Sequence, residues 1–164
     1  MPDAHRELVI NTTPLIALAV ATGGLDVLRI CYDRVLVPNE VEQEILASGP
    51  HAPGVADFTA SPWLERSRMP QEISSYLRNS LDRGEAAVIQ AALHHELALV
   101  CIDEKMGRRA ARLHGLVVTG SAGILVKAKR LGFPLDIPAS IARLKRHGIW
   151  LGKDVEQFLL REGY

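Results

Sequence analysis

The chain has 164 residues, of which 48% are apolar and 23% are charged, and these values predict one soluble globular domain with a sizeable core. No apolar run approaches the roughly 20 residues that a membrane-spanning helix needs, and the first residues lack the basic and then apolar pattern of a signal peptide. The expected location is therefore cytoplasmic, with no membrane partner.

Charge is balanced over the whole chain but unevenly distributed along it. The 19 basic residues equal the 19 acidic ones, yet 15 acidic residues precede Lys105 and 12 basic residues lie from Lys105 onward. Between Lys105 and Arg130 there are seven basic residues and no acidic one. Such a run is either the solvated surface of two helices or a positive field that attracts nucleic acid.

Short apolar runs alternate with helix-sized segments from one end of the chain to the other. This alternation predicts a mostly parallel sheet covered by helices. The stretch 47–62, rich in Gly, Pro and Ser, predicts a surface loop. The expected strands are 7–10, 34–37, 64–66, 97–102 and 116–118; the expected helices are 14–21, 25–31, 40–46, about 72–80, 85–95, 105–114, 122–131, 137–147 and 155–162.

Two polar side chains follow predicted strands directly. Asn11 comes after ELVI, and Asp103 comes after LALVCI. In an open parallel sheet, functional groups collect at the carboxyl ends of the strands. Asp103 is therefore either a cap of the following helix or part of a site.

Two glutamates lie near the starts of predicted helices. Asp82 and Glu85 have the spacing of a capping box, so Glu85 is either a cap or a first-turn acid at the edge of the sheet. Asn39 and Glu42 have the same spacing, which leaves Glu44 without a capping role. Glu44 borders the apolar stripe of its helix, where a partly desolvated carboxylate requires an arginine or a metal ion.

These acids together suggest a divalent metal site. Carboxylates that lie close together repel one another, and a divalent cation removes that repulsion. Mg²⁺ and Mn²⁺ prefer oxygen ligands, which the amide of Asn11 also offers, more weakly than a carboxylate. Thr12 places a hydroxyl nearby, and Glu104 is a further candidate ligand beside Asp103.

The blocks NTTPLIAL, VPNEVEQEI, GEAAVIQAA and LVCIDEK, in this order and spacing, resemble the acidic blocks of PIN-domain ribonucleases. Within that family the chain is most similar to a PIN-like, VapC-toxin-like branch of formerly unknown function. The resemblance extends from about residue 7 to about residue 131. It implies an α/β fold, a three-layer α/β/α sandwich with a central parallel sheet of four to five strands, and one or two Mg²⁺ or Mn²⁺ ions in an acidic pocket.

Position by position, the resemblance places the family's four acids on Asn11, Glu44, Glu85 and Asp103. These four are the predicted catalytic residues, and with Glu104 they are the predicted metal ligands. The family pattern has Asp where this chain has Asn11, and one charge fewer weakens metal binding. RNA contacts are predicted at Thr12 and at the basic residues that follow the fourth block, Lys105, Arg108, Arg109 and Arg112.

The predicted function is that of a divalent-metal-dependent endoribonuclease that leaves a 5′-phosphate and a 3′-hydroxyl. The resemblance further implies the toxin of a toxin–antitoxin pair, a homodimer that a small antitoxin protein binds. The alternative is a catalytically impaired PIN-like module, with Asn11 in place of Asp, that binds RNA or a protein partner without cleavage. A receiver-like signalling domain is disfavoured because the acids are spread over four separate blocks.

We expect residues 1–164 to form a single domain in which 133–164 is a C-terminal helical extension.

Overall fold

The computed structural model describes residues 5–163, and its strands form one sheet. All strand pairs are parallel, and the strands follow the order β3-β2-β1-β4-β5. The predicted fold class is confirmed: the chain is an α/β protein in which helices flank a single parallel sheet of five strands, as in a three-layer sandwich. The strands are β1 (Glu7–Ile10), β2 (Arg34–Val37), β3 (Glu65–Arg66), β4 (Leu99–Cys101) and β5 (Val117–Thr119).

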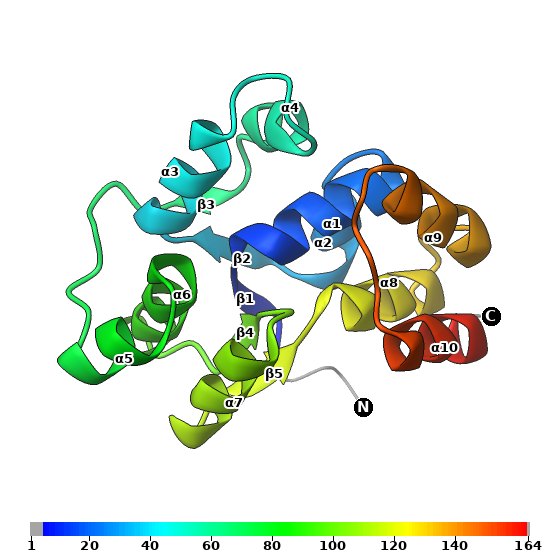
Figure 1. The fold of residues 1–164 in the computed structure, drawn as a ribbon. Helices are drawn as coiled ribbons and strands as arrows, with labels where there is room; N and C mark the ends of the chain where they lie inside the picture. Colours follow the sequence, from blue (N-terminus) through cyan, green and yellow to red (C-terminus); the bar gives the residue numbers. More distant parts are fainter. Residues whose placement is uncertain (1–4, 164) are drawn as a thin grey trace.

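The helices lie in two layers, one on each face of the sheet (Figure 1). On one face α6 packs against β1 and β4, and α7 packs against β5. On the other, α1 contacts α8 and α9, while α2 contacts α8. The helices are α1 (Thr12–Thr22), α2 (Val27–Cys31), α3 (Asn39–Ala47), α4 (Val55–Thr59), α5 (Ser75–Ser80), α6 (Arg83–His94), α7 (Lys105–Leu113), α8 (Ser121–Arg130), α9 (Ile137–Arg146) and α10 (Lys153–Glu162).

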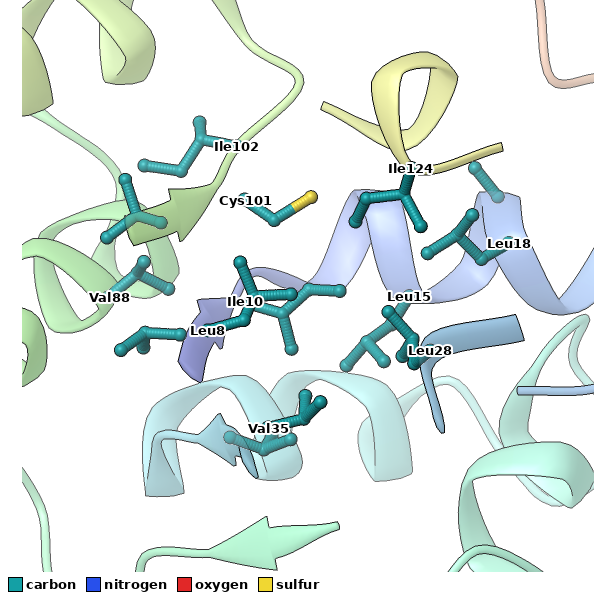
Figure 2. Close-up of a cluster of buried hydrophobic side chains, with 14 of the residues drawn as sticks. Leu8, Ile10, Leu15, Leu18, Leu28, Val35, Val88, Cys101, Ile102 and Ile124 are labelled. Carbon is teal, nitrogen blue, oxygen red and sulfur yellow. The ribbon is translucent and has the colours of Figure 1, made fainter. Parts of the chain in front are cut away.

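The core lies on both sides of the central strand β1. Leu8, Val9 and Ile10 are all fully buried, as expected for a strand covered on both faces. Figure 2 shows Leu8 and Ile10 between Val88 of α6 and Leu15 of α1. Because these three consecutive side chains are buried on both faces of the sheet, they also fix the position of the residue that follows β1.

The loop predicted over 47–62 is only partly a loop, because it contains α4. Val55 and Phe58, three residues apart, are both buried and so fix one face of this short helix. Gly54 precedes it with φ 83°, and a Cβ there would lie 3.2 Å from the Cα of Ile16. The segment therefore contains a glycine that is required for close packing of its backbone against Ile16, in addition to the turn that its composition predicts.

The strand register brings separate parts of the chain to one edge of the sheet. Ile10 pairs with Cys101, and Cys101 pairs with Thr119. Two backbone hydrogen bonds continue this alignment past the strands: Asn11 N–H donates to the Cys101 carbonyl (3.1 Å), and Ile102 N–H donates to the Thr119 carbonyl (3.0 Å). The residues after β1, β4 and β5 therefore lie along the same edge.

The chain ends with two helices beyond the sheet. Helix α9 packs on α1, and α10 packs on both α8 and α9. They bury Ile137, Ile141, Leu144 and Leu159 in the same core that contains β1. None of the helices within residues 5–163 is long and apolar enough to cross a membrane.

Candidate functional site

The amide of Asn11 is buried at the junction of β1 and α1. Asn11 is only 3% exposed and occupies the N-cap position of α1, yet its side chain makes no capping hydrogen bond. Its Oδ1 atom has no hydrogen-bond partner among the described residues. A buried polar oxygen without a partner costs free energy, so this atom is suited to a ligand that brings positive charge.

Two further side-chain oxygens surround the same small space, at Gly84 in the first turn of α6. A Cβ placed on Gly84 would lie 2.8 Å from Glu44 Oε2, 3.0 Å from Asn11 Oδ1 and 3.6 Å from Asp82 Oδ1. The three oxygens come from the second half of α3, the residue that follows β1 and the N-cap of α6. We call this space, bounded by Asn11, Glu44, Asp82 and Gly84, the Gly84 cradle.

The sequence prediction that Glu44 is partly desolvated is wrong. Its residue is exposed, because α3 turns this side chain to the rim of the cradle and directs Val41 and Ile45 into the core. One oxygen is nevertheless fixed: the Thr12 hydroxyl donates to Glu44 Oε2 at 3.0 Å. Thr12, which was predicted to contact RNA, is itself only 5% exposed and positions Glu44.

Glu85 lies behind the cradle and is only 4% exposed. Burial, followed by the negative charges of Asp82 and Glu104, raises the pKa of Glu85 from its ordinary value of 4.5 to about 7. Its carboxylate packs against α7, where a Cβ on Gly107 would lie 3.0 Å from Glu85 Oε1. The predicted cap is also present, since the Asp82 carboxylate accepts a hydrogen bond from Glu85 N–H at 2.8 Å. The helix cap formed by Asp82 is therefore compatible with a role of Glu85 in the site.

Asp103 is bound to the protein itself. Its Oδ1 accepts from Ser121 N–H and its Oδ2 from the Ser121 hydroxyl, each at 2.8 Å. The helix that Asp103 caps is therefore α8, which follows the neighbouring strand, and not α7, which follows Asp103 in the chain. Glu104, the neighbouring candidate, is exposed and only approaches the Thr13 hydroxyl at 3.4 Å.

The structure thus brings together some of the predicted residues and separates others. Asn11 and Glu44 meet at the cradle with Asp82. Asp82, Glu85 and Glu104 line a cavity of about 550 Å³ beside it, together with Lys105. Within residues 5–163, no three acidic, histidine or cysteine side chains converge closely enough to hold a metal ion.

The residues at the cradle nevertheless fit a small oxygen-binding cation by their chemistry. Asn11 Oδ1 lacks a partner, and Glu44 Oε2 lies beside the same methyl-sized space. These are the hard oxygen donors that Mg²⁺ and Mn²⁺ accept. Asn11, Glu44 and Asp82 are therefore the residues that would hold the ion, with Glu85 adjacent in the chain to Gly84.

Sequence reasoning missed the contributions of Asp82 and Gly84. Asp82 was interpreted only as a helix cap, but one of its oxygens also faces the cradle. Gly84, between the cap and Glu85, is where a side chain would fill the space, and a glycine in the first turn of a helix is the signal that was available. Ser121 was also missed, because its partner Asp103 lies 18 residues away.

The capping box predicted at Asn39 and Glu42 is absent from the structure. Helix α3 begins at Asn39, and its N-cap is Pro38, which has no side-chain donor or acceptor. Glu40 is instead the buried acid of this helix, 3% exposed, and its Oε1 accepts from Gln71 N–H at 2.6 Å. Asn39 is inside the helix, one residue past the N-cap position, so it cannot form the predicted cap.

The basic run divides into an exposed part and a structural part. Lys105, Arg109 and Arg112 are exposed on α7, whereas Arg108 is half-buried and donates to the Ile102 carbonyl at 2.9 Å. On α8 the basic side chains contact the protein: Lys129 donates to the Leu135 carbonyl, and Arg130 pairs with Glu162. Lys127 lies over the ring of Tyr32. We call the edge of the sheet that follows β1, β4 and β5, with Glu85, Asp103 and Glu104 beside it, the acidic edge. The positive surface beside it is therefore α7.

Comparison with known proteins agrees with this architecture. No curated protein matches the chain. The family model described as a PIN domain matches residues 7–163, which is nearly the whole chain and includes α9 and α10. PIN domains are in general nucleases, and they typically use divalent metals. The chain therefore belongs to the PIN-domain family.

Proposed function

We propose that this protein is a divalent-metal-dependent endoribonuclease whose ion lies at the Gly84 cradle. The observation that carries the proposal is the unpartnered, buried Oδ1 of Asn11 beside the carboxylate of Glu44. Family membership supports nuclease chemistry in general. The exposed cations of α7 support a polyanionic substrate, since phosphate contacts from Lys and Arg position nucleic acid.

A bound Mg²⁺ or Mn²⁺ would supply a water of lowered pKa and positive charge beside the phosphate oxygens. The protein's own residues carry the remaining roles. Asn11, Glu44 and Asp82 would hold the ion, and Thr12 keeps Glu44 in place. Glu85, once ionised, adds negative charge behind them. Lys105 and Arg109 attract the RNA backbone, and Asp103 fixes the adjoining start of α8 through Ser121.

The test uses Gly84→Ala, which fills the cradle with a methyl group. Alanine is favoured over glycine in a helix, but its Cβ would lie 2.8 Å from Glu44 Oε2 and 3.0 Å from the buried Asn11 Oδ1, so these side chains must shift. The melting temperature of the variant is therefore compared with that of wild type to check that it folds. Gly24→Ala is the matched control, because a Cβ there meets nothing within 4 Å. We expect wild type and Gly24→Ala to cleave a mixed RNA pool in the presence of Mn²⁺, and we expect EDTA to stop this cleavage. Gly84→Ala should bind Mn²⁺ at least about tenfold more weakly by calorimetry and cleave correspondingly less.

Two results would contradict the proposal. One is RNA that stays intact with wild type and Mn²⁺; the other is unchanged Mn²⁺ affinity in Gly84→Ala. End-labelling of the products tests the expected 5′-phosphate and 3′-hydroxyl.

The neutral amide of Asn11 favours a second candidate function, an RNA-binding module that does not cleave. Here the cradle keeps its shape but lacks one negative charge, so metal affinity falls below what catalysis requires. Asn11→Asp separates the two functions. If cleavage with Mn²⁺ appears only in this variant while wild type binds the same RNA, the chain is the impaired module.

The toxin role, the homodimer and the small antitoxin implied by the resemblance stay predictions. Light scattering on the purified chain tests the homodimer.

A further inference from the structure

A second cavity, of about 700 Å³, opens beside the acidic edge. It lies between the start of α8 and the segment from Ile149 to Phe158, which connects α9 to α10 and forms the first part of α10. Figure 1 shows this connection running past the start of α8. Thr13, Asp103 and Glu104 line the cavity as well, so it is continuous with the edge where the proposed cleavage occurs. We call it the Trp150 cavity.

Trp150 is the most unusual residue of its lining. Its side chain is 75% exposed, although large aromatic side chains are normally buried for most of their surface. The other tryptophan, Trp63, packs against the core and lies under the guanidinium of Arg29. Phe158 provides a second aromatic wall and is held against the core. The cavity thus combines a fixed aromatic wall with an exposed indole face.

The polar groups of the cavity favour a base over a phosphate. Among the described residues that line it, the acids are Asp103, Glu104 and Asp154, and the one basic side chain is Arg108. A net negative lining repels a phosphate but accepts hydrogen bonds from the exocyclic amine of a nucleobase. Arg108 is already bound to the Ile102 carbonyl, at the boundary between the cavity and the acidic edge. The backbone of an RNA strand is therefore attracted to α7, outside the cavity.

The backbone at Gly120 packs closely against two side chains at this boundary. A Cβ on Gly120 would lie 2.8 Å from Arg108 Nη1 and 2.8 Å from Asp103 Oδ1. Both of those side chains are held in place, by the Ile102 carbonyl and by Ser121 respectively. A larger residue at Gly120 would therefore push Arg108 or Asp103, which both line the cavity, out of position.

We propose that the Trp150 cavity binds one unstacked base of a single-stranded RNA substrate, with the indole of Trp150 as the stacking surface. The proposal rests on the endoribonuclease function and extends it, since it names a subsite and a class of substrate. Proteins that bind single strands use aromatic faces in this way, because every base has a stacking face. Adenine is the test base, because its amine matches the carboxylate acceptors of the lining.

The experiment isolates the signal of Trp150 in the whole chain. The sequence has two tryptophans, so Trp63→Phe leaves Trp150 as the sole source of tryptophan emission. This variant is titrated in EDTA, to prevent cleavage, with a labelled oligomer of six adenosine nucleotides and with an abasic oligomer of the same length and charge. We expect saturable quenching by the adenine oligomer and an affinity about tenfold higher than for the abasic one.

Trp150→Ala and Trp150→Phe provide the matched pair, read by anisotropy of the labelled RNA. The alanine variant should remove the preference for the adenine oligomer, and the phenylalanine variant should retain part of it. Because Trp150 is exposed, both should melt at the temperature of wild type. A purely structural role of Trp150 would not distinguish the two oligomers.

Three results would overturn the inference in distinguishable ways. Adenine and abasic oligomers that bind equally, without quenching, exclude the base subsite and leave the nuclease proposal standing. Emission that depends on protein concentration without RNA assigns the cavity to a second copy of the chain. Absence of all RNA binding, together with absence of cleavage in Mn²⁺, removes both the subsite and the proposed function.

Discussion

The two halves of the acidic edge differ in how their oxygens are satisfied. On the β5 side, both oxygens of Asp103 accept hydrogen bonds from Ser121. On the β1 side, the Oδ1 of Asn11 has no partner within the described chain, and Glu85 is buried beside two like charges. A satisfied carboxylate stabilises the fold, whereas a buried polar oxygen without a partner, or a buried acid beside like charges, costs stability. This difference is the reason that we propose the ion on the β1 side.

The largest expected effect is on cleavage, through Glu85. Glu85→Gln removes a charge behind the cradle and should lower the rate of RNA cleavage in Mn²⁺ by about 100-fold, the usual cost of losing one electrostatic group from an active site. Glu72→Gln, at an exposed carboxylate before α5, is the control and should cleave like wild type. A loss below threefold in Glu85→Gln would place the chemistry elsewhere on the edge.

The next effect is on stability, through Asp103. Asp103→Ala leaves the first N–H of α8 and the Ser121 hydroxyl without their acceptor, which should cost about 1–2 kcal/mol of unfolding free energy. For a chain of this size that lowers the melting temperature by roughly 3–6 °C. Asp103→Asn keeps one acceptor and should lose about half as much.

The same variants distinguish a structural from a ligand role for Asp103. Calorimetry should find the Mn²⁺ affinity of Asp103→Asn within about threefold of wild type, because its oxygens are committed to Ser121. A tenfold loss with unchanged melting would mean that Asp103 binds the ion, as the sequence predicted, and that the two halves of the edge act as one site.

A separate effect on stability is a pH dependence, again through Glu85. Its pKa is raised from 4.5 to about 7, so the folded state holds a proton that the unfolded state releases. The metal-free protein should therefore lose stability as pH rises from about 4.5 to 7, by up to about 3 kcal/mol, and remain constant above that window. Urea unfolding in EDTA at pH 5 and pH 8 measures it. Glu85→Gln should be less sensitive to pH, and identical pH slopes in both proteins would show that another group causes the change.

The elements of the fold were largely predictable because most of them are short and strongly patterned. ELVI and RVLV became β1 and β2 over the same residues that their apolar runs indicated. The helix over 55–59 was not predictable. Its two buried side chains, Val55 and Phe58, lie in a Gly and Pro-rich stretch, and the helix packs against α1, which the local sequence does not show. The strand predicted over 97–102 is also shorter in the structure, where β4 begins at Leu99 and ends at Cys101.

The candidate site was predictable in its residues and less so in its arrangement. The positions of Asn11, Glu85 and Asp103 near strand ends or helix starts follow from the pattern. The exposure of Glu44 does not follow from the pattern. The apolar stripe shows which side of α3 faces the core, but it does not show whether neighbouring elements cover the side chains at the border of that stripe. Asp82 carries two roles at once, and spacing revealed only the cap.

By itself the sequence determined the alternation of strands and helices, the opposite charges of its two parts, and the acids that lie at the ends of its elements. These are local properties, set by side-chain period and by residue order. The tertiary structure decided which oxygens are satisfied, since the partner of Asp103 lies 18 residues away and that of Glu44 lies 32 residues away. The fold brought those partners together, and it also left the Oδ1 of Asn11 without a partner in the described chain, because the nearby Thr12 hydroxyl donates to Glu44.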